Sequence, residues 1–68
     1  MKPVSGGRFC QVLEREGWTL KRVLGSHNIY AKLGATQILT VPVHGNRDLE
    51  AGTQRTLMRQ AGLTDDAL

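Results

Sequence analysis

The spacing of the apolar residues changes twice along this chain, and these two changes restrict its fold more than any other feature. Residues 9–13 carry Phe, Val and Leu at i, i+3 and i+4, which is the spacing of one helix face. From residue 18 to residue 43 the spacing falls to two, as in half-buried strands. Helical spacing returns at residues 50–61. The sequence therefore predicts a helix, a group of strands and a second helix, in that order.

The first helix has a start signal and a stop signal. Ser5 is suited to the N-cap, because its hydroxyl can accept a hydrogen bond from a backbone N–H of the first turn. Gly17 stands where a glycine after the last turn ends a helix. Gly6 and Gly7 are expected to weaken the first turn, since glycine costs about 1 kcal/mol relative to alanine inside a helix.

Three strands are predicted between the helices, at residues 18–24, 27–32 and 37–43. The Gly25-Ser26 pair suits a tight hairpin turn between the first two, and residues 33–36 suit a second turn. Pro42 has no N–H to donate, so we expect it at a sheet edge or at a strand end.

The second helix is predicted from about Glu50 or Gly52 to Ala61 after a polar loop at residues 44–48, and Gly62 ends it. Its expected apolar stripe is Thr53, Leu57, Met58 and Ala61. We expect the 68 residues to form a single domain with a loose tail at residues 64–68. The order α-β-β-β-α predicts an α+β fold in which two helices pack on one face of a three-stranded antiparallel sheet.

The charge of the chain favours a polyanion or an acidic protein as its partner. Nine Lys and Arg residues against six Asp and Glu residues give a net charge of +3, and two of the six acids are in the tail. There is no apolar stretch typical of a membrane span or a signal peptide. Cys10 is the one cysteine, and no Cys/His spacing resembles a zinc site, so we expect no metal, no cofactor and a cytoplasmic location.

His27 directly follows the predicted hairpin turn. In a strand that begins there, it shares a face with Ile29 and Ala31, while Asn28, Tyr30 and Lys32 share the other face. Histidine can take up or release a proton near neutral pH. His27 is therefore a candidate catalytic residue, and the alternative is an ordinary surface residue of a turn.

Several short segments together resemble the HicA family of small toxins, which are the RNA-cleaving halves of type II toxin–antitoxin systems. They are Gly17-Trp18, Gly25-Ser26-His27, Val41-Pro42, Gly52-Thr53 and Gln60-Ala61-Gly62-Leu63, in the family's order. The resemblance implies a fold like the double-stranded-RNA-binding domain, ribonuclease activity without a metal, and inhibition by a HicB-type antitoxin protein. It also implies that His27 is catalytic. Asn28 stands where many members carry a second histidine, and His44 matches a histidine that we expect to be structural or peripheral.

The chemistry that fits this resemblance is attack by a ribose 2′-OH on its neighbouring phosphate, with His27 as the general base and mRNA as the substrate. Residues expected to bind RNA or stabilise the transition state are Ser26, Asn28, Lys21, Arg22 and Lys32. A solvated sheet face is the alternative for the three cations. Tyr30 either stacks a base or belongs to the core, and Trp18 is expected in the core.

Two other functions are compatible with the same residues. A non-catalytic double-stranded-RNA-binding module would use the basic surface without needing an imidazole at position 27. A degenerate relative would keep partner binding alone.

Overall fold

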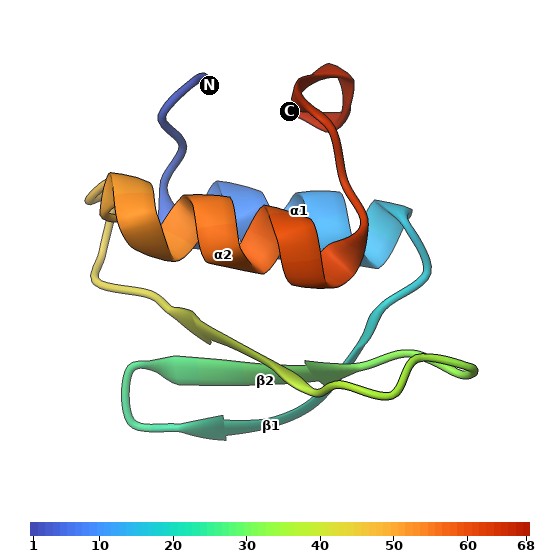
Figure 1. The fold of residues 1–68 in the computed structure, drawn as a ribbon. Helices are drawn as coiled ribbons and strands as arrows, with labels where there is room; N and C mark the ends of the chain where they lie inside the picture. Colours follow the sequence, from blue (N-terminus) through green and yellow to red (C-terminus); the bar gives the residue numbers. More distant parts are fainter.

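The computed structural model describes residues 1–68 and consists of two layers (Figure 1). Its elements are α1 (Gly6–Arg15), β1 (Thr19–Leu24), β2 (His27–Ala31), β3 (Leu39–Pro42), α2 (Ala51–Ala61) and a short 3₁₀ turn, η1 (Asp65–Ala67). Both helices lie on one face of the antiparallel sheet, whose strand order is β1-β2-β3. The predicted α-β-β-β-α architecture is confirmed. None of the helices is long and apolar enough to cross a membrane.

The start of α1 and the end of α2 have the capping residues that the sequence predicts. The Ser5 hydroxyl accepts a hydrogen bond from the Arg8 N–H at 3.0 Å, which caps α1. Gly62 has a φ of +69°, and the Leu63 N–H donates to the Met58 carbonyl at 2.9 Å. This is a Schellman closure, which a residue with a Cβ adopts only with strain.

The β1–β2 hairpin turns at Gly25 and Ser26, where Gly25 has a φ of +59° and Ser26 does not have a positive φ, as in a type II′ turn. The third strand is shorter than predicted, beginning at Leu39 instead of residue 37. Tyr30 pairs with Leu39 in the last register pair, and β2 ends one residue later, so residues before Leu39 lack a full ladder. Pro42 ends an edge strand, as expected.

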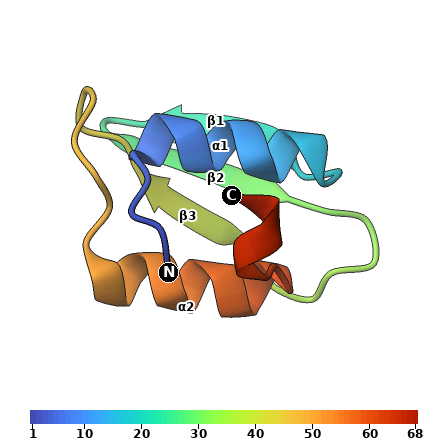
Figure 2. The ribbon, with the colours of Figure 1, turned by 90° about the horizontal axis from the view of Figure 1, so that it is seen from above.

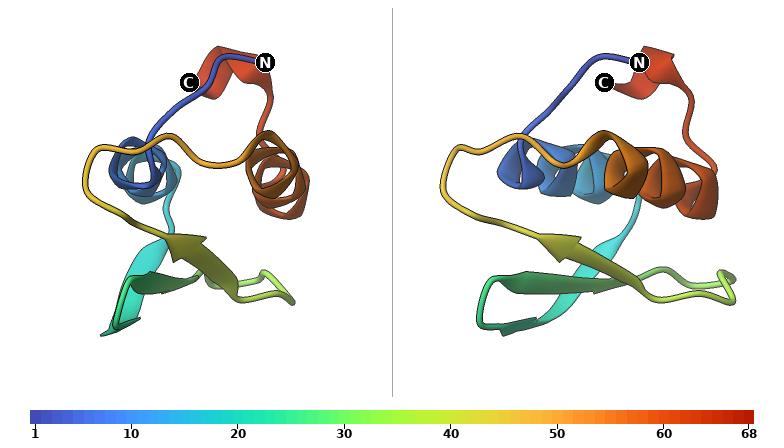
Figure 3. Two further views of the ribbon diagram at one scale, coloured as in Figure 1. Left: turned by 90° about the vertical axis from the view of Figure 1, so that its left-hand side faces the viewer. Right: turned by 60° about the vertical axis from the view of Figure 1, so that its left-hand side comes forward.

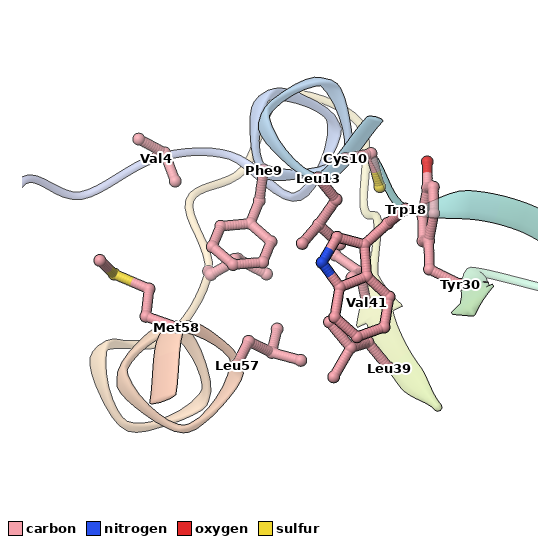
Figure 4. Close-up of a cluster of buried hydrophobic side chains, with 11 residues drawn as sticks. Val4, Phe9, Cys10, Leu13, Trp18, Tyr30, Leu39, Val41, Leu57 and Met58 are labelled. Atoms are coloured by element: carbon pink, nitrogen blue, oxygen red, sulfur yellow. The ribbon is translucent and has the colours of Figure 1, made fainter. Parts of the chain in front are cut away.

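The core lies between the helices and the sheet, and Figure 4 shows side chains from both layers meeting there. Phe9 and Leu13 come from α1, Leu57 from α2, and Leu39 from β3. Trp18 is 4% exposed, which confirms its place in the core. These contacts hold the sheet at a fixed position below the helices.

Gln54 is fully buried on α2, whereas the helical spacing predicted only apolar residues and Thr53 on the buried face. Its side-chain oxygen accepts from the Val4 N–H at 3.2 Å, and its amide nitrogen donates to the Lys2 carbonyl at 2.6 Å. Burial of this amide is tolerated because both of its polar atoms have partners. Gln54 therefore ties the N-terminal segment to α2.

The prediction of a loose tail was wrong. Residues 65–67 form a 3₁₀ turn that lies across the helices beside the N-terminus (Figures 2 and 3). The guanidinium groups of Arg8 and Arg15 donate to the carbonyls of Leu68 and Ala67, and the Leu68 side chain packs against the core. The apolar end of the tail and two arginines on α1 hold it in place.

Candidate functional site

His27 is exposed on the face of the sheet that the helices leave uncovered. It is the first residue of β2 and pairs with Leu24 of β1 and Pro42 of β3. Residues that face each other across neighbouring strands share one side of a sheet, so Leu24 and Pro42 flank the imidazole. The next strand residues alternate, and Tyr30 on the opposite face is only 1% exposed. Because β2 begins at His27, the imidazole shares its face with Ile29 and Ala31, as expected.

The turn that carries His27 is fastened to the third strand. The Ser26 carbonyl accepts a hydrogen bond from the Val43 N–H at 2.7 Å, just beyond the His27–Pro42 pair. Ser26 itself is half-buried. The backbone around His27 is therefore held on both sides, by β1 and by β3.

Asn28 lies away from His27, which corrects its expected place at the RNA site. Its side-chain amide points toward α1 and donates to the Cys10 sulfur at 3.7 Å. This follows from strand alternation, which sends neighbouring side chains of β2 to opposite faces. The buried Cys10 thiol has a raised pKa, mainly because burial disfavours the thiolate.

Tyr30 belongs to the core and does not offer its ring for stacking. Its hydroxyl donates a 2.7 Å hydrogen bond to the Glu14 carboxylate on α1. Burial, followed by hydrogen bonds to Cys10 and Glu14, raises the pKa of Tyr30 above its usual value. Of the two roles left open for this residue, the structure shows the core one, where it joins β2 to α1.

The three candidate cations lie in three different surroundings. Arg22 pairs with Ile29, so it is on the open face and diagonal to His27, within about 8 Å between backbones. The register shifts between Leu20 and Arg22, which leaves Lys21 in a bulge without a cross-strand partner.

Lys32 lies far from His27, contrary to the expectation that it serves the same site. Its ammonium group is 5.9 Å from the centre of the Trp18 ring. It lies five positions after His27, just beyond the end of β2, which corresponds to roughly 16 Å at the usual rise per strand residue. A cation–π contact with Trp18 is its observed role. Arg22 is the candidate cation that the register brings to the face of His27.

A hollow of about 690 Å³ lies between α2 and the free edge of β3, and the sequence analysis did not find it. Its polar lining includes Thr40, Glu50, Thr53, Thr56 and Gln60. Thr53, Thr56 and Gln60 lie on α2, but no motif in the sequence indicates that they meet Thr40 of β3, so only the folded structure reveals the hollow. His44 lies in the loop beyond β3, where the Arg47 N–H donates to its carbonyl at 3.1 Å. No group of three or more His, Cys, Asp or Glu side chains is placed to hold a metal ion.

The family model described as "HicA toxin of bacterial toxin-antitoxin" matches residues 6–63, from the start of α1 to the Schellman closure after α2. No curated protein sequence matches the chain.

Proposed function

We propose that this chain, which belongs to the HicA toxin family, is a metal-independent endoribonuclease that cleaves mRNA in the cytoplasm with His27 as its general base. As a family member it is the toxin of a toxin–antitoxin system. The observation that carries the proposal is an exposed imidazole on the open face of the sheet, with a guanidinium on the same face.

The reaction needs a nucleophile, a base and a group that stabilises the transition state. The ribose 2′-OH supplies the nucleophile, which restricts the substrate to RNA. His27 removes the 2′ proton while the oxygen bonds to phosphorus. The 5′ oxygen then leaves and takes a proton from water, so the products are a 2′,3′-cyclic phosphate and a 5′-hydroxyl. Arg22, on the same face as His27, supplies the positive charge that stabilises the phosphorane in this proposal.

Cleavage in excess EDTA should proceed at the same rate as in untreated protein, because the 2′-OH and His27 together supply the nucleophile and base that a metal-bound water would otherwise supply. The 3′ fragments should carry 5′-hydroxyls, and the 5′ fragments cyclic phosphates, in mass spectra of an early time point. A first product that ends in a 3′-hydroxyl, or a rate that falls with the chelator, would contradict the mechanism.

The antitoxin partner is proposed to be an acidic protein of the HicB type that covers the open face of the sheet. Residues 1–64 carry nine basic and four acidic side chains, so attraction to a negatively charged partner would speed association. Leu24 and Ile38 on or beside this face are 53% and 65% exposed, which offers apolar contact as well. Covering the face would hide His27 from RNA.

Arg22→Glu is expected to slow association with the antitoxin and to weaken RNA binding, each about tenfold at low salt, since it reverses the charge of a cation on the face of His27. Stopped-flow association and RNA titrations measure the two effects. Arg55→Glu is the matched control, because Arg55 is exposed on α2 near the N-terminus and Asp65 and is remote from the open face. Equal effects of the two reversals would show that only net charge matters.

A further inference from the structure

The hollow between α2 and β3 continues the surface that carries His27. Thr40 lines the hollow and pairs with Ile29, while Pro42, two residues further along β3, pairs with His27. The β3 wall of the hollow therefore lies one strand away from the imidazole and diagonal to it. Neighbouring strands are about 4.8 Å apart. A second, smaller hollow of about 260 Å³ adjoins it, and Glu50 and Thr53 line both. A nucleotide next to a bond held at His27 would reach this region.

The lining suits a neutral group with hydrogen-bonding edges. None of the chain's nine Lys and Arg residues lines the larger hollow, and Glu50 makes it unfavourable for a phosphate. Thr53, Thr56 and Gln60 of α2 offer hydroxyls and an amide, while exposed Ile38 and the buried Leu57 offer apolar contact. Proteins that read single-stranded RNA combine such apolar contact with hydrogen bonds to base edges.

The Glu50 carboxylate makes no hydrogen bond or ion pair within the protein. It occupies the N-cap of α2, yet its side chain makes no capping hydrogen bond. Glutamate is not among the residues favoured there, since Asn, Asp and Ser cap best. The single ion pair in the structure joins the N-terminus to Asp65. The carboxylate is therefore free to accept hydrogen bonds from a ligand.

We propose that this hollow, called the α2–β3 hollow below, binds one base of the RNA next to the cleaved bond and selects bases that carry an exocyclic amine. The inference rests on the proposed function. An ionised carboxylate accepts hydrogen bonds and donates none. Adenine, cytosine and guanine present an exocyclic amine with two N–H donors to it, whereas uracil has no amine and offers a single N3–H between two carbonyl oxygens that the carboxylate repels. Uracil is therefore disfavoured at this position.

Binding is tested with His27→Ala protein, which should bind RNA without cleaving it. Tetranucleotides of A, C, G or U are added separately, and NMR spectra of the protein report which residues each one contacts. The A, C and G strands should shift the amide signals of Thr53, Thr56 and Gln60 and bind about tenfold tighter than the U strand. Adding Glu50→Gln supplies an amide that can donate to uracil, so this preference should fall to about twofold. Glu16→Gln, the same change at the exposed end of α1, should leave the preference intact.

The outcomes separate the two proposals. If the four strands bind equally, or if they leave the signals of the α2–β3 hollow unmoved, the base site is wrong. A base preference that Glu50→Gln does not alter would also overturn it. Because this binding needs no catalysis, a wild-type chain that cleaves no RNA would refute only the ribonuclease.

Discussion

His27→Ala is expected to lower RNA cleavage by about 10²- to 10⁴-fold, the contribution usual for a general base. The same change should abolish growth inhibition when the toxin is expressed without its antitoxin. The substitution removes an exposed side chain and leaves the backbone pairing of Leu24, His27 and Pro42 in place, so folding should be little affected. Cleavage of end-labelled RNA and growth curves at matched levels of folded protein measure the two effects.

His44→Ala is the matched control, because it removes the other exposed histidine of the chain from a loop beyond β3. It should retain most of the activity. If His27→Ala and wild type are equally toxic, the general base lies elsewhere. If wild type and His27→Ala bind RNA equally well and neither cleaves it, the protein is instead the non-catalytic RNA-binding module.

Most of the fold follows from local signals. A hydroxyl at Ser5 caps α1, and glycines at positions 25 and 62 have positive φ where the chain must turn. Such signals act within a few residues, so the sequence alone reveals them. Two other features depend on contacts between residues about 50 positions or more apart. The tail is held by Arg8, which donates to the Leu68 carbonyl, and buried Gln54 donates to the Lys2 carbonyl. No local pattern predicts those contacts.

The candidate site was also predictable only where local signals decide it. Strand alternation predicts that His27 shares a face with Ile29 and Ala31, but it does not predict that the helices leave this face open. Alternation also sends Asn28 to Cys10 on the other face, although Asn28 was expected at the RNA site. The bulge at Lys21 sets which cation joins His27, and nothing in the residues around it signals a bulge. The α2–β3 hollow requires the packing of α2 beside β3, which is a tertiary fact.

Gly6→Ala is expected to be strongly destabilising. Gly6 is buried, and a Cβ there would lie 2.1 Å from the Pro42 carbonyl oxygen and 3.1 Å from the Val43 Cα. Both are backbone atoms, so no side-chain rotation relieves the clash. Overpacking of this kind costs about 1–3 kcal/mol or more. In a domain of this size that lowers the melting temperature by about 10 °C or more, measured by circular dichroism.

Gly7→Ala separates this clash from helix propensity, because a Cβ at Gly7 meets nothing within 4 Å. Alanine favours helix over glycine by about 1 kcal/mol, so Gly7→Ala should raise the melting temperature while Gly6→Ala lowers it. Gly6→Ala should also reduce cleavage below the unfolding temperature, since Pro42 is the cross-strand neighbour of His27. If both variants raise the melting temperature, α1 can shift away from β3 without loss of stability. The close approach of α1 to Pro42 then does not hold the site in place.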